Sequence, residues 1–289
     1  MIVCKIGGSS LSSKIDFLNM RDVILSNGKR QVVVVSAPGK RHPKDEKITD
    51  LILKCIERRE RGLSFKKDFL KIYRRYYEIS YELSCFLSVK ENLRALYYDI
   101  LKLESRDYIL SRGEYISAII LANLLNYKMV DAKDILIFNE RGKIDEKLSF
   151  YLTNKILKNT FAVVPGFYGS LYNGKIKTFP RGGSDTTGAY ISAFLNAEIY
   201  ENMTDVPYLY LACPTEFKNP KEIKELSLYD LKLISQFGGR IFNEGAVEPL
   251  IKYNIPLNIK SAHCPNYGTL ALKEPKNPDR ISGDRKSVV

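Results

Sequence analysis

Residues 181–187 carry the side chains best suited to chemistry in this chain. They read Arg-Gly-Gly-Ser-Asp-Thr-Thr. Glycines let the backbone approach a ligand closely, while the arginine, hydroxyls and carboxylate offer charge and hydrogen bonds, a combination that can hold an anion. Small and apolar residues recur at helical spacing over 188–195, so we expect a helix whose positive N-terminus faces the same ligand. An ordinary loop with a Ser or Asp helix cap would use the same residues.

A lysine near the beginning of the chain is the second candidate. Residues 2–6 read Ile-Val-Cys-Lys-Ile and predict a short strand that runs into Gly7, Gly8 and Ser9. Because an unpaired lysine is costly inside an apolar strand, a functional role is favoured for Lys5, with phosphate as the expected ligand. The order differs from that of a P-loop, in which the lysine follows the glycines. A plain tight turn is the alternative.

Composition narrows the class of protein. The chain has 289 residues, 45% of them hydrophobic, which is ample for a buried core. No run of about eighteen apolar residues occurs, and the N-terminus reads as a strand instead of a signal peptide, so we expect a cytoplasmic protein without a membrane partner. The five cysteines are scattered and are expected to be reduced. With only two histidines, a histidine-based metal site or a Ser/His/Asp triad is poorly supplied.

The charge is strongly basic, with 45 Lys and Arg against 33 Asp and Glu and a net charge of +12. The basic residues are spread along amphipathic segments without a recognised nucleic-acid motif. We therefore expect a solvated basic surface and no nucleic-acid partner; binding to nucleic acid is an alternative that rests on charge alone. A polyphosphate ligand would also favour a positive field.

The elements that must position these residues alternate between helix and strand. Helical spacing over 16–26 precedes a continuous apolar run at 31–36, which predicts a buried strand with parallel neighbours and a β-α-β start. Thr49 begins the next helix, either as its cap or as a ligand contact. Apolar positions at helical spacing over 65–86 and 93–103 predict a helical block whose aromatic stripe belongs to the core.

Glu114 follows Ser-Arg-Gly and precedes another helical pattern, so it is expected at a helix start. There it either satisfies the helix dipole or faces a cationic ligand group. The alternation then continues, and the chain is predicted to be α/β. The expected strands are 128–130, 135–138, 161–164, 197–200, 208–210 and 256–259; the expected helices are 147–158, 228–236 and 240–253, with a hairpin at 171–179.

Five motifs, taken together, resemble the amino-acid kinase family and, within it, the catalytic domain of aspartate kinases. They occur in the family's order and with similar spacing at 5–10, 111–114, 165–169, 181–187 and 204–206. The resemblance implies a three-layer fold in which a central, mainly parallel sheet lies between helices. It implies one catalytic domain over 1–272, with the helical block of about 64–126 near the substrate, a nucleotide-binding half over about 181–260 and a loosely ordered tail at 273–289.

The activity implied by this resemblance is transfer of the ATP γ-phosphoryl group to the side-chain carboxylate of L-aspartate, which gives 4-phospho-L-aspartate. Phosphoryl transfer asks the protein mainly to align groups and to neutralise charge, so the scarcity of histidine is no obstacle. Mg²⁺ is expected to arrive on the ATP phosphates, largely ligated by water and without a direct metal motif in the protein. A homodimer is the default expectation.

The resemblance also implies roles at the reacting centre. Lys5 would lie against the transferring phosphoryl group. Gly7, Gly8 and Ser9 would donate backbone or hydroxyl hydrogen bonds to that group, and Asp185 would orient the lysine and the magnesium nucleotide.

Around the two substrates, the resemblance implies a second set of contacts. Glu114 would face the substrate ammonium, and Arg181 would grip a substrate carboxylate. Neutral hydrogen bonds would come from Thr49 and Ser184. Besides the glycine loop, the residues expected at the nucleotide are Thr204, Asp205, Tyr210 and Arg240.

The chain departs from the family pattern in two places. Cys213-Pro214-Thr215 stands where the family usually has Asp-Pro-Arg, and Arg240 stands for a lysine whose compact geometry it does not reproduce. The first change removes an acid and a basic phosphate contact that the family usually has on the nucleotide side. The chain also stops after the kinase domain, where aspartate kinases commonly continue into ACT domains. We therefore expect no feedback inhibition by lysine or threonine through this chain.

Two other readings remain open. A kinase of the same fold could act on another acceptor, such as glutamate, carbamate or a nucleoside monophosphate. A catalytically weak, kinase-like module could instead bind a ligand or partner for regulation. The pair Glu114 and Arg181 argues for an amino acid with a free ammonium and a free carboxylate. The resemblance further implies a role in amino-acid biosynthesis, with lysine and threonine as candidate end products.

Overall fold

The centre of the molecule is an eight-stranded sheet. The computed structural model describes residues 1–180, 182–210, 220–236, 242–262, 267–276 and 278. Within them the strand order is β11-β13-β12-β8-β1-β2-β5-β3, and the pairings are parallel except that of β12 with β13. The strands are β1 (Ile2–Ile6), β2 (Arg30–Val35), β3 (Lys128–Met129), β5 (Ala162–Pro165), β8 (Ile199–Thr204), β11 (Glu225–Ser227), β12 (Leu257–Ser261) and β13 (Thr269–Leu272).

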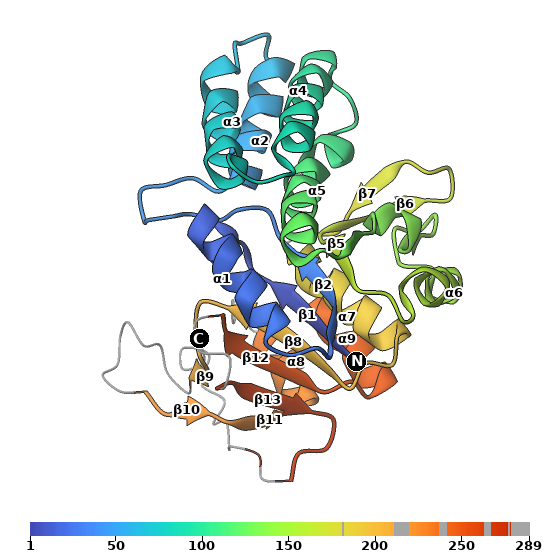
Figure 1. The fold of residues 1–289 in the computed structure, drawn as a ribbon. Helices are drawn as coiled ribbons and strands as arrows, with labels where there is room; N and C mark the ends of the chain where they lie inside the picture. Colours follow the sequence, from blue (N-terminus) through green and yellow to red (C-terminus); the bar gives the residue numbers. More distant parts are fainter. Residues whose placement is uncertain (181, 211–219, 237–241, 263–266, 277, 279–289) are drawn as a thin grey trace.

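Helices cover both faces of this sheet, as Figure 1 shows. On one face, α1 packs its buried Phe17, Met20 and Ile24 into the same core as Ile2 and Cys4. On the other face, a second core joins the sheet to α6, α7, α8 and α9. The predicted three-layer α/β fold is therefore confirmed. The helices named here are α1 (Lys14–Leu25), α6 (Glu146–Leu157), α7 (Gly183–Phe194), α8 (Leu228–Gln236) and α9 (Glu244–Tyr253).

The alternation of side chains along β1 decides where its lysine points. Successive residues of a strand face opposite sides of the sheet. Cys4 and Ile6 lie in the core on the α1 side, whereas Val3 lies in the core on the α7 side. Lys5 therefore points toward α7.

A helical block stands above the sheet in Figure 1 and contains most of the predicted region 64–126. It comprises α2 (Ile48–Glu60), α3 (Lys66–Ser80), α4 (Phe86–Lys102) and the adjoining part of α5 (Arg106–Leu125). The predicted aromatic stripe is core, since Phe65, Phe69 and Tyr76 are buried. The helical pattern expected over 65–86 is broken after Ser80, because Glu82 has a left-handed φ of 72° that turns the chain between α3 and α4.

Short strands complete the fold. The predicted hairpin is confirmed, although it begins earlier than expected, at Tyr168, and Gly174 has a φ of +78° in its turn. The two strands of the hairpin belong to a three-stranded sheet of β4 (Ile137–Phe138), β6 (Tyr168–Leu171) and β7 (Ile176–Thr178). A separate two-stranded sheet is formed by β9 (Leu209–Tyr210) and β10 (Glu222–Ile223). Two 3₁₀ turns are labelled η1 (Gly8–Leu11) and η2 (Ala132–Asp134).

Two ends of predicted segments fall outside the described residues. Residues 240 and 241, expected to open the last helix, lie there, and so do 277 and 279–289 of the expected tail. In the parts of the chain that the structure covers, none of the helices combines the length and the apolar character needed to cross a membrane.

Candidate active site

Several of the predicted site residues that the structure describes lie where the parallel strands β1, β2, β5 and β8 end. Ligands of open α/β sheets bind outside the carboxyl ends of the strands. The glycine loop follows β1, Gly166 follows β5 and Asp205 follows β8. The glycine loop is hydrogen-bonded to β8, because the Gly7 amide donates to the Met203 carbonyl. The loop after β5 is hydrogen-bonded to β2, because the Gly166 amide donates to the Val35 carbonyl.

Lys5 and Asp185, separated by most of the chain in sequence, are in direct contact. The Lys5 Nζ lies 2.7 Å from the Asp185 Oδ1, and the two side chains are 11% and 16% exposed. The ammonium comes from β1, and the carboxylate comes from the first turn of α7. The prediction that these two residues meet is confirmed. A partly buried ion pair at the sheet edge places a positive charge where an anion could reach it.

Asn202 completes this contact and was not anticipated. It lies on β8 in register with Lys5 and is buried. Its Nδ2 donates to the Asp185 Oδ1 at 3.0 Å, while its Oδ1 accepts from the Lys5 Nζ at 3.5 Å. The predicted strand ended at Tyr200, and so residue 202 was outside it. A polar side chain inside a longer strand would have been the signal.

The N-terminus of α7 begins at a glycine. Gly182 occupies the cap position with a φ of +77°, and within the described chain no side chain caps the helix there, so the alternative of an ordinary loop with a Ser or Asp cap is wrong. A left-handed residue was needed because the chain turns sharply into the helix. The uncapped end leaves backbone N–H groups and the helix dipole available to an anion. Arg181, the expected carboxylate ligand, lies outside the described residues.

The glycine loop owes its composition to close backbone packing. A Cβ on Gly8 would lie 2.5 Å from the Ala37 carbonyl oxygen, and a Cβ on Gly39 would lie 2.7 Å from the carbonyl carbon of Gly8. The Gly39 amide also donates to the Gly8 carbonyl at 2.7 Å. The loop after β1 and the loop after β2 therefore support each other, and Ser9 is left exposed at the surface of the site.

Glu114 lies inside α5 and not at a helix start, which corrects the expectation. The helix dipole therefore does not explain it. The carboxyl is only 4% exposed, and its Oε2 has no hydrogen-bond partner among the described residues. Burial raises the pKa of Glu114 to about 8, although a backbone hydrogen bond from Ala37 opposes the shift. A buried carboxyl with a spare oxygen, beside the loop after β2, is suited to a cationic group.

Two further predicted contacts flank this region. Thr49 is the second residue of α2, whose cap position is Lys47, so the interpretation of Thr49 as a helix cap is wrong. Its half-buried side chain remains a candidate ligand contact. Ser184 is 8% exposed and packs against Gly166, where a Cβ would lie 2.7 Å from the Ser184 Oγ. The glycine after β5 thus allows α7 to approach.

The residues expected at the nucleotide are only partly described. Thr204 ends β8, and its hydroxyl donates to the Asp205 carboxylate at 2.9 Å. Tyr210 lies further along, in β9, where it pairs with Glu222 of β10. Arg240 lies outside the described residues, as do Cys213 and Thr215. Across the described ranges, no three His, Cys, Asp or Glu side chains are grouped so that they could hold a metal ion.

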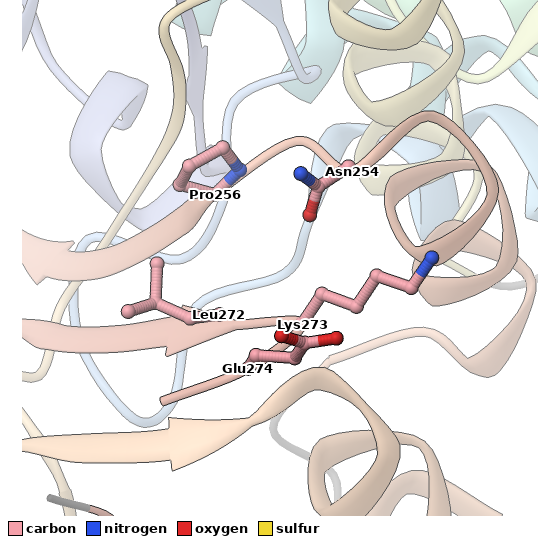
Figure 2. Close-up of a pocket in the computed structure, with 5 residues that line it drawn as sticks. All are labelled: Asn254, Pro256, Leu272, Lys273 and Glu274. Atoms are coloured by element: carbon pink, nitrogen blue, oxygen red, sulfur yellow. The ribbon is translucent and has the colours of Figure 1, made fainter. Parts of the chain in front are cut away.

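A pocket of about 390 Å³ lies at the other end of the strands, where the parallel strand β12 begins. Figure 2 shows Asn254 and Pro256 on one side of it, with Leu272, Lys273 and Glu274 on the other. Pro256 precedes β12, and Leu272 ends the antiparallel β13. The pocket is therefore remote from the carboxyl ends of the parallel strands and is not part of the candidate site.

The chain matches known sequences over nearly all of its length. The profile of the Amino acid kinase family matches residues 1–261. Aspartokinase 3 of Bacillus subtilis is 33% identical over 281 residues, which make up 92% of this chain and 62% of that protein. This chain thus spans less than two thirds of the length of that relative.

Solved structures agree with the fold. Aspartate kinase of Clostridium acetobutylicum matches with a TM-score of 0.88 at 40% identity, over 96% of this chain and 63% of that one. E. coli aspartokinase III in complex with aspartate and ADP matches with a TM-score of 0.86 over 96% of this chain and 66% of that one. At 23% identity, this second likeness concerns the fold alone.

Proposed function

Because the chain belongs to the amino acid kinase family, we propose that it is an ATP-dependent aspartate kinase. It would transfer the γ-phosphoryl group of ATP to the side-chain carboxylate of L-aspartate and release ADP and 4-phospho-L-aspartate. The observation that carries the proposal is the contact of Lys5 with Asp185 at the sheet edge, beside the uncapped N-terminus of α7. The similar chains of Bacillus subtilis and Clostridium acetobutylicum are named aspartokinase 3 and aspartate kinase, respectively.

The reacting centre would work by alignment and charge. The acceptor carboxylate and the γ-phosphoryl group are both anionic, so bringing them together requires positive charge between them. Lys5 would supply that charge, held in place by Asp185 and Asn202. Backbone N–H groups of Gly8, Ser9 and the α7 N-terminus would add fixed donors to the phosphoryl oxygens as the acceptor oxygen bonds to phosphorus and ADP leaves. The expected Gly7 donor is excluded, because its amide already donates to the Met203 carbonyl.

The acceptor would bind on the side of the helical block. Glu114, buried and with one oxygen unpartnered among the described residues, would receive the aspartate ammonium. Arg181 would hold the α-carboxylate through a bidentate pair. Thr49 and Ser184 would contribute neutral hydrogen bonds around the acceptor.

The nucleotide would bind toward the 181–260 half of one catalytic unit over 1–272. Thr204 and Asp205 at the end of β8, Tyr210 and Arg240 are its proposed contacts. The donor set fits a Mg²⁺ ion that is carried by phosphates and water, because Asp185 offers a single carboxylate at the site and no three-ligand cage is formed by the described residues. The bound ion would neutralise phosphate charge.

The test is a panel of acceptors with purified protein, Mg-ATP and hydroxylamine, which traps acyl phosphates as hydroxamates. We expect hydroxamate with L-aspartate and little with glutamate. Turnover with another acid and none with aspartate would reassign the acceptor. A complete lack of nucleotide binding in calorimetry would favour the non-catalytic regulatory module instead.

The setting of the enzyme is part of the same proposal. The free thiols of Cys4, Cys55 and Cys85 suit a reducing compartment, and we propose the cytoplasm. We propose a homodimer, the commonest assembly of soluble enzymes, which sedimentation would test. The product would serve amino-acid biosynthesis, with lysine and threonine as the candidate end products.

A further inference from the structure

Helix α3 of the helical block reaches the candidate site through two consecutive residues. Arg75 is 3% exposed, and its Nη1 donates to the Gly39 carbonyl at 2.8 Å while its Nη2 pairs with Asp45. Tyr76 is fully buried, and its hydroxyl donates to the Gly113 carbonyl at 2.7 Å. The two side chains therefore hold backbone carbonyls on two different segments.

The carbonyl held by Arg75 belongs to the residue that supports the glycine loop. Gly39 donates its amide to the Gly8 carbonyl, and no Cβ fits at either glycine without meeting the other segment. A shift of Gly39 would therefore shift Gly8 and its neighbours. The loop after β1 would lose the alignment that phosphoryl transfer needs.

The carbonyl held by Tyr76 immediately precedes Glu114. Gly113 packs directly on the loop after β2, since a Cβ there would lie 2.9 Å from the Ala37 Cβ. Its carbonyl also accepts from the Ser117 hydroxyl at 3.2 Å, so loss of the Tyr76 hydroxyl would leave one donor in place. The position of the Glu114 carboxyl thus depends in part on α3.

Stability alone does not account for an arginine at position 75. Its Nε has no partner among the described residues, and its one carboxylate partner also pairs with Arg41. Burial lowers the pKa of the Arg75 guanidinium, and the nearby Arg41 charge lowers it further. An apolar side chain of similar volume would fill such a position at lower cost.

We propose that Arg75 and Tyr76 are positioning residues, which join the phosphate-facing glycine loop and the carboxylate Glu114 to one rigid helix. Arg75 acts on Gly8 through Gly39, and Tyr76 acts on Glu114 through Gly113. The inference rests on the proposed function for the roles of the two segments. It adds that the helical block sets the alignment of donor and acceptor.

The first test compares Arg75→Met and Tyr76→Phe by steady-state kinetics. Arg75→Met should lower kcat by about 10- to 100-fold with ATP and aspartate saturating, because the glycine loop is misaligned. Tyr76→Phe should raise KM for aspartate about fivefold with little change in kcat, because one neutral hydrogen bond is lost near the ammonium site. Equal effects of the two variants on the same constant, or no effect, would overturn the proposal.

Neighbours on the same helix provide matched controls. Arg74 and Tyr77 are exposed, and Arg74→Met and Tyr77→Phe should leave both constants unchanged. If Arg75→Met fails to fold, Arg75→Lys decides the matter. It keeps the charge but cannot hold Gly39 and Asp45 in one planar fork, so kcat should still fall at least about fivefold. A wild-type kcat in Arg75→Lys would argue against positioning.

A readout without turnover separates this inference from the proposed function. Hydrogen exchange in the segment 36–47 should be faster in Arg75→Met and unchanged in Tyr76→Phe. In Arg75→Met the Gly39 carbonyl loses its donor, so the hydrogen bond from the Gly39 amide to the Gly8 carbonyl is held less firmly. If wild-type protein does not phosphorylate aspartate, the proposed function fails while this measurement still decides the role of Arg75. Unchanged exchange in Arg75→Met would refute that role.

Discussion

Lys5 has a place in the fold that packing alone would not give to a lysine. It interrupts a buried strand, and its charge is met by Asp185 and by the Asn202 amide. Removing the ammonium would leave the acceptor and the phosphoryl group facing each other without that positive charge. At the residue scale, the proposed chemistry thus depends on the positive charge of Lys5 and on the side chains of Asp185 and Asn202 that hold it in place.

Lys5→Ala should lower kcat by about two to three orders of magnitude, on the scale of removing one charge-stabilising donor. The measurement is steady-state turnover at saturating ATP and aspartate. Lys66→Ala, which changes an exposed lysine of α3, should retain wild-type turnover. A near-normal kcat in Lys5→Ala would remove Lys5 from the mechanism.

Glu114 should impose a pH dependence on acceptor binding. Burial raises its pKa to about 8, so much of the free enzyme carries a neutral carboxyl near neutral pH. An ammonium group binds the ionised form, and KM for aspartate should therefore fall as pH rises toward and through about 8. Glu114→Gln should have a higher KM without this dependence. A pH-independent KM in wild type would contradict the assignment.

The same shift has a signature in stability that needs no substrate. The folded protein holds the Glu114 proton up to about pH 8, whereas the unfolded chain releases it near its ordinary value of 4.5. Between these values the native state binds more protons, so the contribution of Glu114 to stability falls as pH rises. Urea unfolding of wild type and Glu114→Gln across that window should reveal the difference.

At the scale of elements, α7 depends on how its first turn is entered. Gly182 has a positive φ, and a Cβ there would run into the Asn243 side chain. Gly182→Ala should therefore destabilise the protein by about 1–3 kcal/mol and lower turnover, because the N-terminus of α7 must shift. Gly174→Ala is the control, since its φ is equally positive but no described atom lies within 4 Å of the added Cβ. Equal losses in urea unfolding would mean that backbone strain, and not the position of α7, dominates.

Periodicity and turn chemistry predicted much of this arrangement from the sequence. The β-α-β start, the buried strand at 31–36 and the hairpin depend on local patterns, and the structure contains all three. The contact of Lys5 with Asp185 was expected from the resemblance to the amino-acid kinase family, which implies that Asp185 orients that lysine. Local signals thus predicted the elements well and located the centre of the site.

The errors arose where distant parts of the chain decide the local structure. Gly113 reads as a break before a helix, but it lies inside α5 because Ala37 packs against it. Thr49 reads as a cap, although the helix begins one residue before it. Asn202 was not predicted as a site residue, because its contact with Lys5 depends on the register in which β8 pairs with β1. Such contacts are properties of the assembled sheet and not of any segment.

At the scale of the whole molecule, a buried charge cluster links four neighbouring strands. Glu201 on β8 pairs with the Arg30 Nε at 2.8 Å and with the Lys260 Nζ at 2.6 Å, and it accepts from the Cys4 thiol at 3.3 Å. The cluster joins β2, β1, β8 and β12, and it lies one residue from Lys5 and Asn202 along their strands. Because successive side chains alternate, it occupies the sheet face opposite the ion pair of the site.

Glu201→Gln should therefore destabilise the entire fold by about 3–5 kcal/mol, because the buried Arg30 and Lys260 would lose their ion pairs with the Glu201 carboxylate. Burial alone would raise the pKa of Glu201, but hydrogen bonds from Arg30 and Lys260 outweigh it and lower the pKa below its ordinary value of 4.5. The stabilisation is then complete above about pH 4.5 and is lost as the pH falls through the lowered value. Urea unfolding should separate the free energies of unfolding of wild type and Glu201→Gln widely at pH 7 and progressively less in acid.

Glu198→Gln is the matched control, because Glu198 lies directly before β8 and its side chain is exposed. The loss of its charge should change the free energy of unfolding little at any pH. A similar small effect for Glu201→Gln would mean that the strands are held by backbone pairing and apolar packing without help from the cluster.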